Sequence, residues 1–306
     1  MISAILKSVI SLFLIILVGF YGSKKKIITR ELNKGLIDLL LNIALPIMVV
    51  SSFMFTFDDL IKGNVFKAFY YSFAAYLIMI AFSYLLIIPV KCDKRLIIHF
   101  ANIFTNTGYI GFPVLNAIFG PEGVVYGSIF NMFFVIFVWT YGINIFRGKI
   151  EKEYLKQEII KAILNPSVIA VVIGVIILIF NLKIPNILMQ SINSIGSMTG
   201  PLSMIIVGAS LSNIKSGNHL LNWKIYYGIV TRLIIIPTIL YVFSLLICDT
   251  SIVADSVIII ASMPAATMTS IFAESYEKEK DFATITVLAT TLLSIFTIPL
   301  LIRILV

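Results

Sequence analysis

Two clusters of glycine, proline and hydroxyl residues interrupt apolar segments of this 306-residue chain, at residues 106–113 and 263–269. Glycine and proline end or bend a helix and leave backbone N–H and C=O groups without helical partners. A helix that restarts after such a break presents free N–H groups and a partial positive charge, which together bind anions. The two clusters therefore predict two helix starts that are able to hold an anionic group.

The first cluster reads Asn-Thr-Gly-Tyr-Ile-Gly-Phe-Pro. Its proline removes a backbone donor, its glycines permit a break, and the Asn106 amide adds a hydrogen-bond donor beside the new helix start. The alternative is an ordinary proline kink whose small residues allow close helix packing. The candidate ligand-binding residues of this cluster are Asn106, Thr107, Gly108, Tyr109, Gly111 and Pro113.

The second cluster begins with Met-Pro-Ala-Ala-Thr. The proline again breaks the segment, and the threonine hydroxyl can satisfy a freed carbonyl or line a cavity. A kinked packing helix is the alternative here too. The candidate residues are Met263, Pro264, Ala265 and Thr267, together with Asn131, a polar residue in a neighbouring apolar segment.

The composition identifies an all-α integral membrane protein. The chain is 59% hydrophobic and 12% charged, and its mean hydropathy is +1.04. Runs of about 20 apolar residues, enough to cross a bilayer as a helix, recur along the whole sequence. We expect ten transmembrane helices, at residues 2–22, 35–57, 65–90, 96–119, 123–146, 158–180, 184–212, 223–247, 252–274 and 281–305.

A polar stretch from Arg147 to Glu158 divides the ten spans into two halves, residues 1–150 and 151–306. An odd number of spans in each half gives the halves opposite orientations, as in transporters built from inverted repeats. Spans 4 and 9, which hold the two clusters, are then equivalent. We expect their breaks to cross near the middle of the membrane.

The distribution of positive charge predicts the orientation. Of the 23 Lys and Arg residues, 17 lie in or beside the loops that follow the odd-numbered spans. Positive loops face the cytoplasm, so both termini are predicted to lie outside the cytoplasmic membrane. The net charge of +8 therefore reflects topology, and no nucleic-acid partner is predicted. Cys92 and Cys248 fall on opposite faces, where they form neither a disulfide nor a metal site.

Charged residues within the spans are few. No Asp or Glu lies in the middle of a span, which disfavours an exchanger that binds its coupling cation on a deep carboxylate. Enzyme motifs for metals, nucleophiles and phosphates are also missing, so we predict no catalysis and no cofactor. Arg232 lies inside span 8, where a charge is costly. It could hold a substrate carboxylate or a backbone carbonyl, or extend to the cytoplasmic surface.

In these motifs the chain resembles the auxin efflux carrier family, which includes the plant PIN-formed carriers and bacterial malate and malonate permeases. The matching stretches are residues 106–113, residues 232–237, Met263-Pro264 and residues 272–276, and the ten-span layout extends the resemblance over the whole chain. The resemblance implies crossed spans 4 and 9, as in bile-acid symporters and sodium–proton antiporters. It also implies an elevator movement of spans 3–5 and 8–10 against a scaffold of spans 1, 2, 6 and 7, which forms a homodimer.

We therefore expect a secondary transporter that moves a small organic anion, such as malate, malonate or an auxin-like carboxylate, across the lipid bilayer. In this hypothesis helix N-terminal amides and Asn106 hold the carboxylate at the crossing, while Tyr109 and Met263 shape the pocket. A sodium-coupled symporter of the bile-acid type is one alternative, and sodium dependence of uptake distinguishes it. A membrane receptor that binds its ligand without moving it is the other, and binding without flux distinguishes that one.

Overall fold

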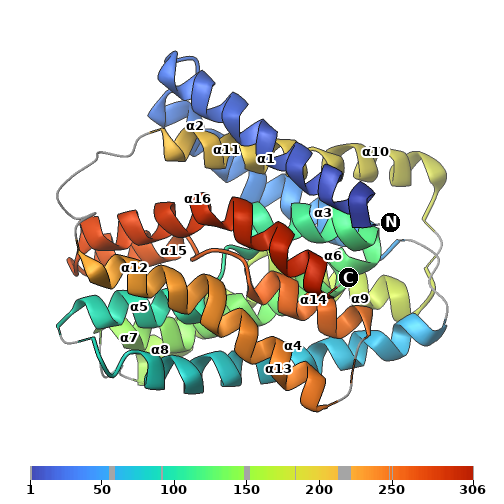
Figure 1. Ribbon diagram of the computed structural model, residues 1–306. Helices are drawn as coiled ribbons and strands as arrows, with labels where there is room; N and C mark the ends of the chain where they lie inside the picture. The colour runs from blue at the N-terminus through green and yellow to red at the C-terminus, as the bar shows by residue number, and fades with distance from the viewer. Residues whose placement is uncertain are drawn as a thin grey trace.

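The structure, a computed structural model, describes residues 2–54, 59–90, 92–147, 152–182, 184–212, 222–247, 249 and 251–305. This part of the chain is helical, and its only β-type pairing is an isolated antiparallel bridge between Thr105 and Ala265. The helices run lengthwise through the molecule, and both ends of the chain lie at the same end of it (Figure 1). Cys248 and residues 148–151 of the central basic loop lie outside the described part.

Six helical stretches of the described chain are long and apolar enough to cross a membrane. A pair of helices bent by 51° at residues 164–165 adds a seventh if it is counted as one span. The first predicted span is a single helix, Ile2–Lys24, and the ninth is divided into Ile252–Ala261 and Met268–Ser275. The fourth is interrupted between Ile103 and Thr107. The chain is thus a helical membrane protein, and the ten-span inverted repeat stays a prediction.

The first half of the chain contains α1 (Ile2–Lys24), α2 (Arg30–Leu39), η1 (Leu40–Ala44), α3 (Leu45–Ser52), α4 (Asp59–Leu86), α5 (Lys94–Ile103), η2 (Thr107–Gly111), α6 (Phe112–Phe137), η3 (Val138–Gly142) and α7 (Ile143–Arg147), where η marks a π-helical turn. Within α6 the chain bends at Gly120, whose φ of 64° is a conformation that favours glycine. This bend falls between the predicted fourth and fifth spans.

The second half contains α8 (Lys152–Ile163), α9 (Pro166–Ile179), α10 (Asn186–Ser197), α11 (Thr199–Leu211), α12 (Trp223–Val230), η5 (Thr231–Ile235), α13 (Ile236–Leu246), α14 (Ile252–Ala261), α15 (Met268–Ser275) and α16 (Lys280–Leu305). Asparagine side chains cap the N-termini of two of these helices. Asn165 Oδ1 accepts from the Ser167 N–H, and Asn222 Oδ1 accepts from the Lys224 N–H. Such caps satisfy backbone donors that have no partner inside the helix.

Proline accounts for three of the π-helical turns. η1, η2 and η5 each end two residues before a proline, at Pro46, Pro113 and Pro237. A proline lacks the N–H that would bond the carbonyl four residues earlier, and its ring clashes with that carbonyl. The preceding turn widens instead of breaking, as π-helical turns allow.

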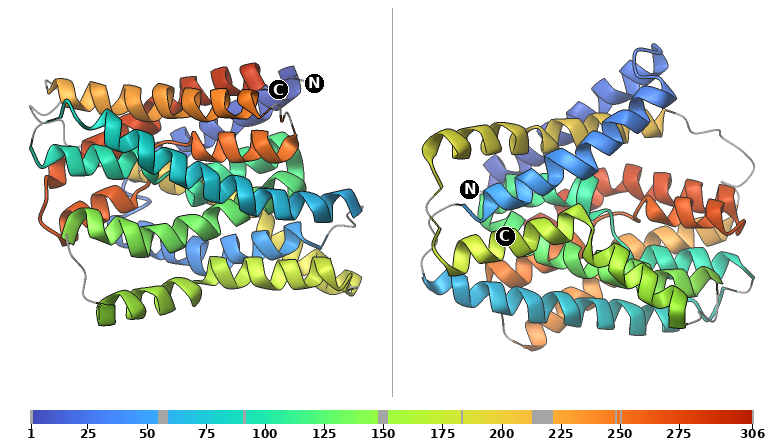
Figure 2. Two further views of the ribbon diagram at one scale, coloured as in Figure 1. Left: turned by 90° about the horizontal axis from the view of Figure 1, so that it is seen from below. Right: turned by 180° about the vertical axis from the view of Figure 1, so that it is seen from behind.

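α1 and α11 pack against each other through glycine. A Cβ at Gly208 would lie 2.0 Å from the Ile16 carbonyl oxygen, and one at Gly19 would lie 2.1 Å from the Ile205 carbonyl oxygen. The two backbones are therefore in direct contact, as small residues permit in membrane helices. With α2 and α10 these helices form a separate layer on the other helices (Figures 1 and 2).

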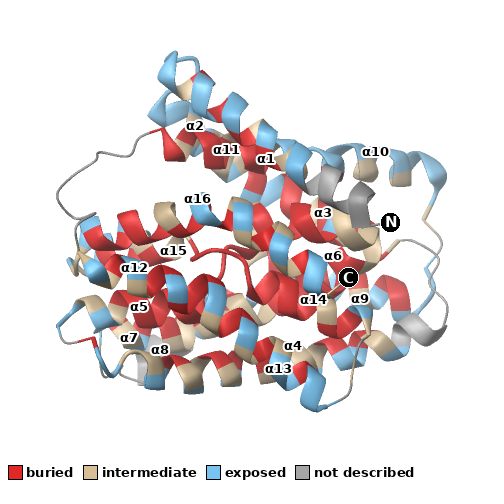
Figure 3. Cartoon of the chain, viewed as in Figure 1, coloured by how far each residue is buried: buried red, intermediate tan, exposed pale blue. Residues whose placement is uncertain are grey.

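Polar and apolar residues are arranged as a membrane protein requires. Large apolar side chains are exposed on the outside, including Leu17, Phe66, Ile187 and Phe296, and such apolar surface fits lipid. Buried residues gather in the middle of the molecule, above all along α5 and α14 (Figure 3). Many of the buried side chains are Ser, Thr and Asn, so the polar groups lie in the interior.

Candidate functional site

The two predicted helix breaks pair with each other. α5 ends at Ile103 and α14 ends at Ala261. After each of these helices the backbone continues in extended or loop conformation. The Asn106 N–H donates to the Pro264 carbonyl oxygen at 2.8 Å, and the Ala266 N–H donates to the Phe104 carbonyl oxygen at 2.9 Å. The freed backbone groups thus satisfy one another, which is what helix breaks inside a membrane require.

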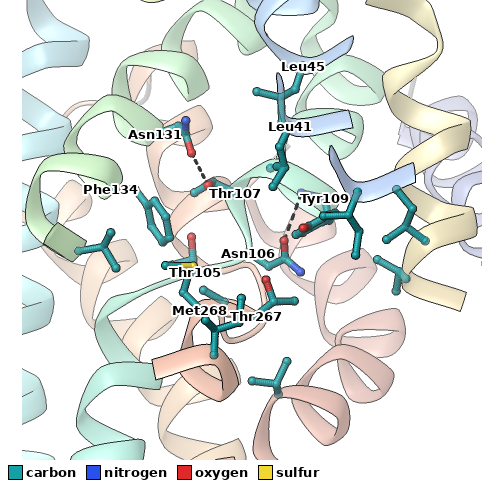
Figure 4. A pocket seen from close by; sticks show the side chains of 18 of the residues that line it. Leu41, Leu45, Thr105, Asn106, Thr107, Tyr109, Asn131, Phe134, Thr267 and Met268 are labelled. Carbon is teal, nitrogen blue, oxygen red and sulfur yellow. Dashed lines mark hydrogen bonds between the residues drawn. The ribbon is translucent and has the colours of Figure 1, made fainter. Parts of the chain in front are cut away.

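The side chain of Asn106 caps the helical segment that follows the first break. Its Oδ1 accepts a hydrogen bond from the Tyr109 N–H at 3.2 Å. Because this oxygen is used as the cap, the Nδ2 group is the side of the amide that remains free to donate. In the described part of the chain Nδ2 makes no hydrogen bond, and the amide lies between Tyr109 and Thr267 (Figure 4).

The second break ends in a helix start without a side-chain cap. α15 begins at Met268, and Thr267 before it makes no capping hydrogen bond. The Thr269 and Ser270 N–H groups donate to the Ala266 and Thr267 carbonyl oxygens, at 3.0 and 3.1 Å, whereas the Thr267 and Met268 N–H groups have no hydrogen-bond partner among the described residues. These two N–H groups lie at the end of the helix that carries its partial positive charge. Both Thr267 and Met268 border the same space as Asn106 (Figure 4). An anionic group fits this combination of donors.

A cavity of about 600 Å³ lies at the crossing. Most of its wall is apolar, and the aromatic rings of Tyr109, Phe134 and Trp139 contribute to it. Among the described residues that line the cavity, none is charged. The groups that can bind a ligand here are therefore amides, hydroxyls and helix N-termini in an otherwise apolar cavity. Small-molecule sites usually have this composition.

Asn131 joins the site through Thr107. The Thr107 hydroxyl donates to Asn131 Oδ1 at 2.5 Å, and both side chains are buried at the cavity wall (Figure 4). This bond occupies the Asn131 oxygen and leaves its NH₂ group as a second free amide donor. A residue from α6 is thereby oriented by a residue at the first break.

Six of the eleven predicted residues line the cavity, namely Asn106, Thr107, Gly108, Tyr109, Asn131 and Thr267. Ala265 is buried behind the cavity, where its N–H donates to the Thr290 hydroxyl at 3.3 Å. At Gly111 a Cβ would lie 3.0 Å from the Ile260 side chain, so this glycine lets helices approach. The carbonyls of Met263 and Pro264 accept hydrogen bonds within the protein.

Pro113 lies on a different cavity. This second space, of about 480 Å³, is also bordered by Asn116, Gly196 and Pro201. Its wall comes from α1, α3, α6, α10 and α11. The first cluster thus separates into a part that faces the larger cavity and a part that faces the smaller one.

Several lining residues were not expected from the sequence. They come from the predicted spans 2, 5, 6, 7 and 10 and include Leu41, Leu45, Phe134, Trp139, Ser167, Ser210 and Thr291. Ser167 follows the bend at residues 164–165 and Leu45 precedes Pro46, but the others stand away from any break, so no local signal marks them. Only the packing of distant helices brings them to the cavity.

Arg232 binds backbone carbonyls and is fully buried. Its Nε donates to the Met263 carbonyl oxygen at 3.0 Å, and Nη1 donates to the Asn102 carbonyl oxygen at 2.9 Å. Nη2 donates to the carbonyls of Met263, at 2.6 Å, and Ala261. Of the three roles considered for this residue, the structure shows carbonyl binding, and Arg232 does not line the cavity.

Comparison with known proteins gives two likenesses. The sequence model of a family described as "Membrane transport protein" matches residues 4–302, nearly the whole chain. The chain is also 26% identical to an uncharacterized transporter of Methanocaldococcus jannaschii over 309 residues, which cover 95% of this chain and 96% of that protein. Because both likenesses extend over the two halves, they include both helix breaks and Arg232.

Proposed function

The chain belongs to this membrane transport protein family, the auxin efflux carrier family, and we propose that it carries a small organic anion, most simply a carboxylate, across the membrane. The observation that supports this most strongly is the pairing of the two helix breaks beside an uncharged cavity. Paired broken helices at the junction of repeats are where secondary transporters bind their substrates.

In the proposed site, amide and backbone donors hold the carboxylate. Nδ2 of Asn106 and the NH₂ group of Asn131 each lack a hydrogen-bond acceptor among the described residues. The start of α15 adds two more donors, the N–H groups of Thr267 and Met268. Hydrogen bonds from such donors to a carboxylate are charge-assisted and strong. They provide charge recognition without a lysine or arginine in the cavity.

The cavity favours a monoanion with an apolar body. A second carboxylate, as in malate or malonate, would have to enter an apolar wall with no cation to pair with it, which costs several kcal/mol. The rings of Phe134 and Trp139 offer flat apolar contact to the body of the ligand. We therefore rank aromatic monocarboxylates above dicarboxylates as substrates.

For the movement we propose an elevator mechanism in a ten-span inverted repeat. The larger cavity is lined by the ends of spans predicted to face the cytoplasm, and the smaller one by the opposite ends of spans 2, 4 and 7. An inward-facing state fits this arrangement. Spans 3–5 and 8–10 would carry the crossing past the scaffold of spans 1, 2, 6 and 7, which would also form the homodimer in the cell membrane.

The deciding experiment is flux of labelled indole-3-acetate, phenylacetate, malate and malonate into proteoliposomes. Loss of the Asn106 donor and cap should reduce saturable flux by roughly tenfold or more in Asn106→Ala, since a hydrogen bond to a charged group contributes about 1.5–3 kcal/mol. The matched control is Asn144→Ala, because Asn144 is exposed and bonds only the carbonyl of its own helix. Equal flux in both variants would remove Asn106 from the site.

The same liposomes separate the alternatives. A sodium-coupled symporter would require an inward sodium gradient for uptake. A receptor would bind the acid in a filtration assay and give no flux. Saturable flux that persists without sodium supports the proposed carrier.

A further inference from the structure

Three carbonyl oxygens converge at the crossing, and the residues that carry them do not line the cavity. They belong to Asn102 at the end of α5, to Ala261 at the end of α14, and to Met263 in the second break. Helix C-termini carry a partial negative charge. In transporters with broken helices, such carbonyls and helix ends coordinate the coupling cation.

In this chain a guanidinium group occupies that position. Arg232 comes from η5, a different element, and reaches all three carbonyls with Nε, Nη1 and Nη2. The residue is fully buried, and no described Asp or Glu forms an ion pair with it. Its positive charge is balanced by carbonyl dipoles alone, as the charge of a bound metal cation would be.

The polar groups nearby are consistent with a site built around one cation. Asn102 Oδ1 accepts from the Thr231 hydroxyl at 3.0 Å, which fixes the end of α5 beside η5. The buried hydroxyl of Tyr76 has no hydrogen-bond partner in the described chain. A buried charge without a counter-ion is costly in a membrane and is retained for a function.

We propose that the three carbonyls form a monovalent-cation site and that Arg232 is a resident cation that fills it permanently. Given the proposed transport function, the carrier then needs no sodium ion or proton at the crossing to hold the two broken helices together. Arg232 is a positioning residue in this view: its donors are engaged by carbonyls, so it does not touch the substrate. It fixes the ends of α5 and α14, and through them the two breaks.

The first test measures cation binding and does not depend on transport. Arg232→Ala empties the site, and Arg303→Ala, at an exposed position of α16, is the control with the same change of charge. In choline chloride the Tm of purified Arg232→Ala should fall by several degrees, and millimolar NaCl or guanidinium chloride should restore most of the loss. Labelled sodium should bind this variant and neither wild type nor Arg303→Ala.

Several outcomes of this test would overturn the proposal. They are an unchanged Tm in Arg232→Ala, a loss that neither sodium nor guanidinium reverses, and an inability to recover folded Arg232→Ala in either salt. Arg232→Lys, which restores a tethered positive charge, should lose less stability than Arg232→Ala and should not respond to sodium. Equal losses in the two variants would mean that charge is not what the site requires.

The second test uses flux of the acid that wild type transports. Wild-type flux should be unchanged when choline replaces sodium on both sides, whereas flux by Arg232→Ala should become sodium-dependent. A sodium requirement in wild type would overturn the resident cation. Absence of flux for every acid would instead contradict the proposed function and leave the cation-binding result to be judged by itself.

Discussion

The backbone N–H of Asn106 donates to the carbonyl oxygen of Pro264 at 2.8 Å, although the two residues belong to opposite halves of the sequence. With the reciprocal bond from Ala266 to Phe104, it makes a two-residue antiparallel pairing in the interior of a helical membrane protein. Each break therefore provides the hydrogen-bond partners that the other needs. Neither break is stable alone in this form, because its backbone groups would be left without partners.

Cross-linking tests this pairing directly. Directly opposed residues of an antiparallel pair have Cα atoms about 4.5–5.5 Å apart, within reach of a disulfide. On a background with Cys92 and Cys248 replaced by serine, the double variant Thr105→Cys/Ala265→Cys should cross-link on mild oxidation. A protease site introduced in residues 148–151 allows the protein to be cut into its two halves. If the disulfide has formed, the halves run together on a gel and separate only after reduction.

The single variants Thr105→Cys and Ala265→Cys are the controls for that experiment. They should release the two halves with or without oxidant. If the two halves of the oxidised and cleaved double variant separate without reduction, in membranes where the protein is folded, the crossing is contradicted.

The bond between Thr107 and Asn131 should contribute to substrate affinity. Thr107→Val keeps the shape of the side chain but removes the hydroxyl that orients the Asn131 amide. A hydrogen bond of this kind contributes about 0.5–1.5 kcal/mol, so KM for the transported acid should rise by roughly 3- to 10-fold. Kinetics of flux in proteoliposomes provide the measurement. Thr238→Val, at an exposed threonine that bonds only its own helix, should leave KM unchanged.

The close contact of α1 and α11 should make Gly208 intolerant of a side chain. A methyl group there would lie 2.0 Å from a carbonyl oxygen, so Gly208→Ala must push the helices apart and should destabilise the protein by about 1–3 kcal/mol. Gly200→Ala in the same helix is the control, because its nearest neighbour would be a side-chain atom at 3.8 Å. Thermal unfolding in detergent should show a lower Tm for Gly208→Ala only.

Acid should weaken the contact between Asp249 and α4. Burial acts to raise the pKa of Asp249, but hydrogen bonds from the Tyr71 hydroxyl and the Ser251 N–H outweigh it and hold the pKa below its ordinary value. A depressed carboxyl pKa stabilises the fold above the unfolded value of about 4, and this contribution is lost as the pH falls further.

Asp249→Asn should therefore lower Tm at pH 7 and lose this effect in strong acid. Tm of wild type and variant, measured from pH 7 down to pH 3, provides the comparison. Tyr71→Phe should behave in the same way because it removes the main donor. A difference in Tm that stays constant over the whole range would show that ionisation of Asp249 does not contribute.

The positions of the helix breaks could be predicted from the sequence because glycine and proline act locally. Pro264 and the first cluster both fall where the structure interrupts a helix, and Pro113 adds a π-helical turn. The break begins before the first cluster at residues 106–113, since Phe104, within the predicted span 96–119, is already extended. Its conformation is set by the hydrogen bond to Ala266, which no property of the residues around it indicates.

The wall of the cavity and the partners of Arg232 could not be predicted in the same way. Trp139 and Ser210 are ordinary residues of apolar helices, and they reach the cavity because several helices pack around the crossing. For Arg232 the sequence left three roles open, because a charge inside a span is compatible with each of them. Three carbonyls, two of them at the ends of distant helices, decide between those roles.

The resident guanidinium also has a consequence for the membrane potential. A sodium ion that travels with a carboxylate cancels its charge, but Arg232 never leaves the protein and so cancels nothing over a complete cycle. Each turnover of the proposed carrier would move the full charge of its ligand. For a monoanion an inside-negative voltage then contributes about 2.3 kcal/mol per 100 mV toward the outside, or a roughly fifty-fold concentration ratio. Voltage alone would suffice to make such a carrier an exporter.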